Sequence, residues 1–420
     1  MRKLFASVCA ILIAATTMHA GNGGSAYTMF GIGDVRYNPG VRSTGMGYTS
    51  FGLPSGNHIN TMSPASWTRI SRVRIEAGGL YEGINTAETN RSLYQAKGLF
   101  SGAMLAFPIS PANGIVLVGG FSPFSYVGYN TSFRNSQADI DYRINEIGSG
   151  SLTKAIVGLS YAPHQDISLG LGVNYFFGET GVERTFIPLT SGTSGGTLNS
   201  EEEKRGVSFT IGGMYNGFGG LSEGLRPLSV GFAVTTESNL KLDISDRIIF
   251  TSEADTFATS EKRLNIPVSV GVGIAYQFSD RWIVAADYFT QAWKNARYDG
   301  KPLLNIRNNN RFGIGAEKLP IKDASGWFDK LTYRLGFSYN QTYYQIYGEP
   351  INEWAFTGGF TMPVAGETRM NVGIEYAQRG SKSTVVQPNL IPTNLVKDNI
   401  IRVSFSLTIV EPWFVRYEEE

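Results

Sequence analysis

Residues 400–409 read I-I-R-V-S-F-S-L-T-I, and this stretch decides the fold class. Ile401, Val403 and Phe405 fall on one face of an extended chain, whereas Arg402 falls on the other. Alternation with a period of two is typical of a β-strand that has one apolar and one polar face. The stretch therefore predicts a strand near the end of an all-β chain.

The same alternation recurs along the sequence, at residues 167–175, 228–234, 266–276, 331–339 and 368–376. Segments of about 9–11 residues suit a tilted strand that crosses a membrane. Aromatic residues near the segment ends, such as Trp282 and Trp293, indicate girdles at the two membrane interfaces. The alternative is a water-soluble barrel with its apolar face inward; segment length and aromatic ends favour a membrane barrel.

The composition agrees with this interpretation. The chain has 50 Gly in 420 residues, 12% aromatic residues and only 17% charged residues. Its mean hydropathy of -0.10 would suit a soluble protein, but alternating strands conceal their apolar face from any average. The net charge of +1 gives no sign of a nucleic-acid partner.

Short and long connections alternate between the predicted strands. Tight links fall at residues 108–113, 163–166, 278–281 and 363–367, and long polar links at 83–94, 188–204, 243–262, 298–310 and 380–398. Outer-membrane barrels have short periplasmic turns and long external loops. Residues 71–410 are therefore predicted to form a transmembrane antiparallel β-barrel of about 14 strands, in a bacterial outer membrane.

Residues 1–20 are typical of a secretory signal peptide, with the apolar core Leu4–Ala15 and a cleavage site between Ala20 and Gly21. The single cysteine, Cys9, lies inside this core, so the mature chain would have neither a disulfide nor a reactive thiol. At the other end of the chain, residues 411–420 are expected to form a periplasmic tail.

Residues 21–70 lack alternation and are rich in Gly and Pro, yet they include apolar side chains such as Tyr27, Phe30 and Met46. A disordered periplasmic tail is usually poorer in such residues. The inward strand faces are rich in small residues, which would leave room for a packed segment. We therefore predict an N-terminal plug, or hatch, in the barrel lumen.

The third predicted strand, Ile115–Arg134, contains an interruption. It carries Gly119, Gly120, Phe121, Ser122 and Pro123 in succession. Proline has no N–H for a ladder, and the glycines permit sharp bending. Two interpretations stay open at this point: a β-bulge that only bends the strand, or a gap between neighbouring strands.

At these residues the chain resembles the FadL-type long-chain fatty acid transporters over essentially its whole mature length. Residues 41–47, followed by Asn60, Ser63, Pro64 and Ala65, look like the hatch of that family with its Asn-Pro-Ala signature, in which Ser63 stands in place of the asparagine. The likeness also depends on residues 265–276 and 281–288, on the number of strands and on the interrupted third strand, through the order and spacing of all these features.

The resemblance implies passive uptake of hydrophobic molecules such as long-chain fatty acids, which would leave sideways through the kinked third strand. The expected partners are a hydrophobic or lipid ligand, outer-membrane lipid and lipopolysaccharide, and the barrel assembly machinery during biogenesis, with the barrel itself a monomer. The alternative is an interaction protein that serves as a docking or shuttle component of a secretion system.

Residues that would carry chemistry are sparse. His58 and His164 have no His or Cys partner nearby in sequence, so we expect no metal site. Residues 220–224 match G-x-S-x-G, but that motif needs a strand-to-helix elbow with triad partners. We therefore expect neither an enzyme nor a cofactor.

Overall fold

The computed structural model describes residues 24–37, 40–89, 91–137, 140–190, 195–250, 253–321, 324–346, 348–385 and 393–411. The expected signal peptide with its cleavage site at Ala20 and Gly21 lies outside the described residues, as does all of the expected C-terminal tail except Glu411.

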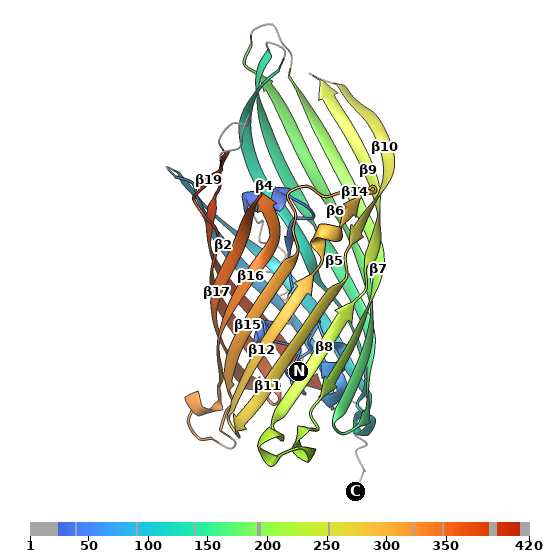
Figure 1. The fold of residues 1–420 in the computed structure, drawn as a ribbon, viewed down its shortest axis with the longest axis vertical. Helices are drawn as coiled ribbons and strands as arrows, with labels where there is room; N and C mark the ends of the chain where they lie inside the picture. Colours follow the sequence, from blue (N-terminus) through green and yellow to red (C-terminus); the bar gives the residue numbers. More distant parts are fainter. Residues whose placement is uncertain are drawn as a thin grey trace.

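The described strands form one closed antiparallel β-barrel of 14 strands, as predicted (Figure 1). The wall consists of β2 (Val73–Ala87), β3 (Ser92–Ser110), β4 (Ile115–Gln137), β5 (Ile140–His164), β6 (Ile167–Pro188), β7 (Gly196–Tyr215), β8 (Leu228–Thr235), β9 (Ser238–Phe250), β10 (Glu253–Ile266), β11 (Ser269–Ser279), β12 (Trp282–Gln291), β15 (Asn309–Lys318), β16 (Thr332–Ile346), β17 (Glu349–Ala365), β18 (Thr368–Gly380) and β21 (Lys397–Glu411).

Two wall strands are each made of two segments. β8 and β9 both pair with β7 and follow one another along it, and β10 and β11 pair with β9 and β8 in the same way. The barrel closes where β21 pairs with β2 from Val73↔Glu411 to Ala87↔Lys397.

The remaining elements are short. They are β1 (Asp34–Val35), β13 (Arg297–Tyr298), β14 (Lys301–Pro302), β19 (Thr384–Val385) and β20 (Thr393–Asn394), the helix α2 (Val41–Thr44), and the 3-10 turns η1 (Ala26–Met29), η2 (Pro64–Arg69), η3 (Pro111–Asn113), η4 (Phe218–Gly220), η5 (Glu223–Leu225), η6 (Trp293–Asn295) and η7 (Phe328–Lys330). No helix in the described part of the chain is long and apolar enough to cross a membrane.

The strands extend further than the sequence pattern predicts. Residues 196–204 belong to β7, and residues 243–250 and 253–262 belong to β9 and β10, although we expected long loops there. These extensions carry charged side chains and so lack the apolar alternation on which the prediction depended. On this side of the barrel the strands rise above the others (Figure 1).

The outer face of the barrel is apolar and the lumen is polar. Along β6, Leu169, Leu171 and Val173 point outward and are 47%, 52% and 41% exposed, whereas the intervening Ser168 and Asn174 are buried. A water-soluble barrel would have the reverse arrangement, so that alternative is excluded. The apolar belt on a closed barrel identifies an outer-membrane protein, as predicted.

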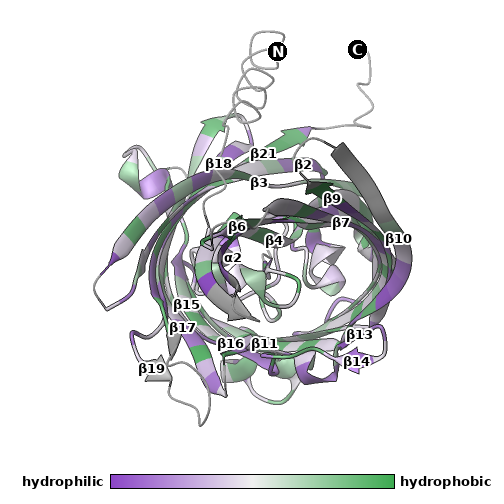
Figure 2. Ribbon diagram, turned by 90° about the horizontal axis from the view of Figure 1, so that it is seen from above, coloured by the Kyte–Doolittle hydropathy of each residue, from purple (hydrophilic) through white to green (hydrophobic). Residues whose placement is uncertain are grey.

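The described part of residues 24–70 lies in the lumen (Figure 2). Wall glycines allow its backbone to approach closely. A Cβ atom at Gly336 would lie 2.2 Å from the Gly47 backbone nitrogen, and one at Gly315 would lie 2.4 Å from the Met46 carbonyl oxygen. Any side chain at these wall positions would displace the lumenal backbone.

Candidate functional site

The candidate site begins at a seam in the barrel wall, between β3 and β4. Their ladder runs from Ser110↔Ile115 up to Ala103↔Phe121. Beyond that pair, β3 continues beside β2 as far as Ser92, and β4 continues beside β5 as far as Gln137. Among the described residues, no ladder joins β3 to β4 above Ala103 and Phe121. We call this unpaired stretch the seam.

The five residues singled out in the third strand lie at the base of the seam. Gly119 and Gly120 are still in the ladder with β3, and Phe121 makes its last pair. Ser122 and Pro123 follow directly, and a register shift between Pro123 and Ser125 marks a bulge against β5. Bulge and gap, which we treated as alternatives, thus occur together at this point of the wall.

A short lumenal strand takes the place of β3 beside β4. Asp34 and Val35 of β1 pair with Tyr126 and Ser125, and the Arg36 N–H donates to the Phe124 carbonyl at 2.7 Å. The backbone of β4 is therefore partnered from the lumen where its wall neighbour has left it.

Side-chain contacts connect the two strands at the seam. At its base, the ring centroids of Phe100 and Phe121 lie 5.5 Å apart. The Lys97 ammonium of β3 lies 3.8 Å from the centroid of the Tyr126 ring of β4. Such a cation–π contact is worth about 0.5–2 kcal/mol. It is weak in comparison with a strand ladder, so this part of the wall is the easier one to open.

A cavity of about 310 Å³ lies in the lumen behind the seam. Its seam side is lined by apolar atoms of Leu99, Phe100 and Pro123. Tyr343 and Tyr344 of β16 supply aromatic rings, with centroids 4.4 Å apart. The cavity therefore joins the wall gap to the interior of the barrel.

Charged groups also surround the cavity. Glu82 of β2 accepts from Arg36 at 2.8 Å and from Arg402 at 2.6 Å, and the Lys97 ammonium lies 3.2 Å away. Arg402 also reaches Glu375 at 2.6 Å. We call these groups, with Asp34, Glu353, Arg379 and Asp398, the lumenal ion network.

The lumenal ion network holds β1 in place. Arg379 of β18 donates to Asp34 at 2.9 Å, while Arg36 is bound to Glu82. Buried charges are costly unless they are paired, and removing one partner leaves the other uncompensated. The network therefore couples the lumenal segment to β2, β18 and β21.

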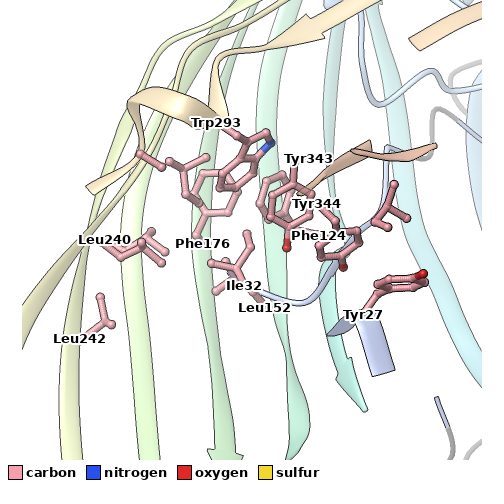
Figure 3. Packing of buried hydrophobic residues seen from close by; sticks show 14 of the residues in the cluster. Tyr27, Ile32, Phe124, Leu152, Phe176, Leu240, Leu242, Trp293, Tyr343 and Tyr344 are labelled. Carbon is pink, nitrogen blue, oxygen red and sulfur yellow. The ribbon is translucent and has the colours of Figure 1, made fainter. Parts of the chain in front are cut away.

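An apolar cluster adjoins the cavity and extends across the lumen to β9 and β10 (Figure 3). Tyr343 belongs to both, and its ring centroid lies 4.9 Å from that of Trp293. Leu240 and Leu264, from β9 and β10, are 0% and 2% exposed in this cluster. The cluster fills the lumen behind that part of the wall.

The residues of the predicted hatch motif do not line the cavity. Asn60 donates from Nδ2 to the Ser50 carbonyl at 2.9 Å and accepts the Met62 N–H at 2.9 Å. Pro64 and Ala65 begin η2, which packs against β6; a Cβ at Gly170 would lie 2.3 Å from the Pro64 carbonyl carbon. Ser63 is fully buried.

Ser63 differs from the asparagine of the resembled signature in what its side chain can do. The Ser63 hydroxyl is buried and makes no hydrogen bond within the described residues. The local turn is instead held by Asn60, whose Oδ1 also accepts the Ser63 N–H at 3.3 Å.

The residues considered for chemistry lie apart. His58 is in the lumenal segment, whereas His164 is the last residue of β5, with its Nδ1 3.4 Å from Asp166. Within the described residues, no group of three or more His, Cys, Asp or Glu side chains is arranged to hold a metal ion. Residues 220–224 lie on the exposed turns η4 and η5, and not at a strand-to-helix elbow.

A family model described as BamG matches residues 1–418. This chain belongs to the BamG family. A search of curated proteins found no match. The family match covers nearly the entire chain, so it applies to the barrel and to the lumenal segment together.

Solved structures with the same fold include a Pseudomonas aeruginosa FadL homologue, at 14% identity and a TM-score of 0.63, covering 89% of this chain and 99% of that one. The Pseudomonas putida toluene transporter TodX matches at 16% identity and a TM-score of 0.60, covering 90% and 99%. The CymD monoaromatic hydrocarbon channel matches at 15% and 0.58, covering 91% and 99%. This BamG-family barrel therefore has the FadL-like fold.

The lumenal ion network of this BamG-family chain was not predicted from the sequence. Arg402 and Glu375 stand on the polar faces of alternating strands, next to apolar residues that face lipid. Charges at such positions point into the lumen, and that signal was available. Which charge meets which is decided by the strand register, which no local pattern contains.

Proposed function

We propose that this BamG-family barrel takes up hydrophobic molecules passively across the outer membrane, with the cavity as binding site and the seam as lateral exit. The observation that carries the proposal is the end of the β3–β4 ladder at Ala103↔Phe121, beside the cavity. In a membrane, unpaired wall backbone is tolerated only where it is buried in protein or lines a cavity. The names of the FadL homologue, TodX and CymD support uptake of hydrophobic compounds.

The cavity favours a ligand with an apolar body and a polar end. Its volume of about 310 Å³ is at the lower limit of ordinary ligand pockets, which hold about 300–1,000 Å³. Leu99, Phe100 and Pro123 offer apolar contact beside the seam, whereas Arg36 and Arg402 supply positive charge to the cavity lining. A long-chain fatty acid has this chemistry, with its chain toward the seam and its carboxylate toward the arginines.

Exit of the ligand requires the seam to open. The Lys97–Tyr126 contact would have to separate, and β1 would move with the lumenal segment to which it belongs. The lumenal segment thus acts as a hatch in this mechanism. The ion pairs of the network return it to its closed position after each passage.

Deleting Ser122 and Pro123 together tests the proposal. Removal of two residues preserves the inward–outward alternation of β4 while it removes the break. We expect uptake of a fluorescent long-chain fatty acid into cells to be lost. The barrel should still assemble, as shown by the change of its electrophoretic mobility on heating. A deletion of Gly220 and Leu221, in the exposed η4 turn, is the matched control. Uptake that survives the first deletion would contradict the lateral route.

The family match favours a second function. The BamG model covers residues 1–418, and its name points to barrel assembly. The chain would then act as a protein-interaction component beside the barrel assembly machinery, with its tall extracellular strands as a binding surface. Depletion of the protein would reduce the amount of other outer-membrane barrels, and the machinery would co-purify with it. The Ser122–Pro123 deletion separates the two functions, because it abolishes uptake and spares co-purification.

A further inference from the structure

The wall has a second interruption, where β8, β10 and β12 end. β8 ends at Thr235 and β10 ends at Ile266, before Pro267, which has no N–H to offer. β12 stops at Gln291, and above it β10 has only the single pair Leu264↔Tyr298 with β13. A notch of about 480 Å³ remains between these elements, and we call it the outer notch.

The outer notch faces away from the lumen. Arg263 and Asn265, which line it, alternate along β10 with Leu264 and Ile266, which are 2% and 3% exposed inside the lumenal apolar cluster. Successive side chains of a strand point to opposite faces. Arg263 and Asn265 therefore lie on the outer surface of the barrel.

The outward-facing residues around the notch change from apolar to charged along each strand. Arg263 pairs with Lys241, Lys241 with Arg205, and Arg205 with Phe177. Arg205 is the first charged outward residue of β7 above the apolar Val207, and Val268, at the lower lip of the notch, is an exposed apolar residue. Arg263 therefore lies at the upper edge of the apolar belt, at the level of the lipid headgroups.

The notch has an excess of hydrogen-bond donors. Arg297 donates only to the backbone carbonyls of Lys294 and Ala296, at 3.2 and 3.0 Å. Neither Arg297 nor Arg263 forms an ion pair with any carboxylate in the described part of the chain. The amides of Asn239, Asn265 and Asn295 complete the polar lining.

The acidic groups nearby are mostly engaged. Glu237 lines the notch and accepts from the Asn265 amide at 3.2 Å. Glu261 and Asp243 are bound to Lys241, at 2.9 and 3.3 Å. Among the residues that line the notch, two guanidinium groups face the one carboxylate of Glu237, so the lining is net positive and favours an anion, while Asp299 adjoins it without being a lining residue.

We propose that the outer notch binds the phosphate group of a phosphorylated lipid of the outer leaflet. A guanidinium group matches the geometry of phosphate oxygens with two parallel hydrogen bonds. Arg263 and Arg297 would hold the phosphate, Asn265 would donate to it, and the acyl chains would lie against Val268 and Phe232 of the belt. The site lies on the outer surface of the barrel, whereas the uptake cavity lies in the lumen behind the seam, so the two are separate sites.

Native mass spectrometry of the purified barrel with phosphorylated lipid A and with its dephosphorylated form tests the site. We expect the phosphorylated lipid to bind more tightly, and the double variant Arg263→Ala/Arg297→Ala to weaken it about tenfold or more, a loss of about 1.4 kcal/mol or more. The variant Arg226→Ala, on an exposed turn at the other end of the barrel, should bind as the unchanged protein does.

Three outcomes would overturn the site: equal affinity for both lipids, unchanged affinity in the double variant, or displacement of the lipid by millimolar inorganic phosphate alone, which would indicate a free-ion site. Heat-modified gel mobility shows whether each variant is folded. Fatty acid uptake should be unchanged in the double variant, so failure of this proposal and failure of the uptake proposal are distinguishable.

Discussion

Both interruptions of the barrel wall occur at a proline, and they differ in what lies behind them. At the seam, Pro123 stands where β4 loses β3, and a cavity lies on the lumenal side. At the outer notch, Pro267 separates β10 from β11, and Leu264 and Trp293 pack in the lumen behind it, where only a small cavity of about 40 Å³ remains. A proline break alone therefore does not make a passage. The packing on its inner side decides whether the gap leads inward or stays a surface site.

The two regions are also held together by different forces. Behind the seam, β1 is fixed by buried ion pairs, which are strong only while every partner is present. Behind the notch, apolar side chains are fixed by burial, which weakens gradually as contacts are removed. The loss of stability on substitution should therefore be abrupt behind the seam and gradual behind the notch.

The largest effect is expected for Glu82→Gln, behind the seam. It leaves Arg36, Lys97 and Arg402 without their shared carboxylate, and loss of one buried partner typically costs 3–5 kcal/mol, so we expect about that much. Urea unfolding in detergent micelles measures it. Glu261→Gln, which breaks an exposed pair with Lys241, is the control and should cost less than about 1 kcal/mol.

Behind the notch, Leu240→Ala should destabilise the barrel by about 2–5 kcal/mol, because the fully buried side chain leaves a cavity. Uptake should stay at its original rate, since this side is not the route. The same unfolding and fatty acid uptake assays apply. An increase in uptake would show that the apolar cluster acts as a gate, and the contrast between the two regions would then fail.

A smaller effect is expected for Tyr126→Leu, which removes the ring beneath Lys97. The loss should be about 0.5–2 kcal/mol. If the contact restrains the seam, fatty acid uptake becomes faster although stability falls. Tyr298→Leu removes a second lysine–aromatic contact, with Lys262 at 5.4 Å, and serves as control because it lies on the notch side.

The smallest effect concerns pH. Burial in the lumen, with Arg334 and Arg42 nearby, holds the pKa of His58 well below its usual value. The unfolded chain binds a proton as the pH falls through about 6.5, whereas folded His58 stays neutral. The free energy of unfolding should therefore decrease between pH 7 and pH 5. His58→Gln should reduce that slope, and an unchanged slope would contradict the assignment.

Much of this fold could be predicted because its pattern is local. Residues 400–409 show their two faces without reference to any other strand, and Pro123 lacks an N–H whatever surrounds it. The lumenal ion network could not be predicted in the same way. Glu82 meets Arg402 only because the barrel closes between β2 and β21. Asp34 and Arg36 lie in a segment without any periodic pattern, so their strand pairing depends on the space that β3 leaves.

The most direct test of the account is a reversible cross-link across the seam. In the variant Lys97→Cys/Tyr126→Cys, whose parent side chains meet across the gap, a short cleavable bis-maleimide would tie β3 to β4. Lys97→Cys alone, treated identically, corrects for the loss of the lysine. If ligand leaves through the seam, fatty acid uptake should stop on cross-linking and return when the linker is cleaved. Uptake that continues at the rate of the single variant while the seam is tied would contradict it.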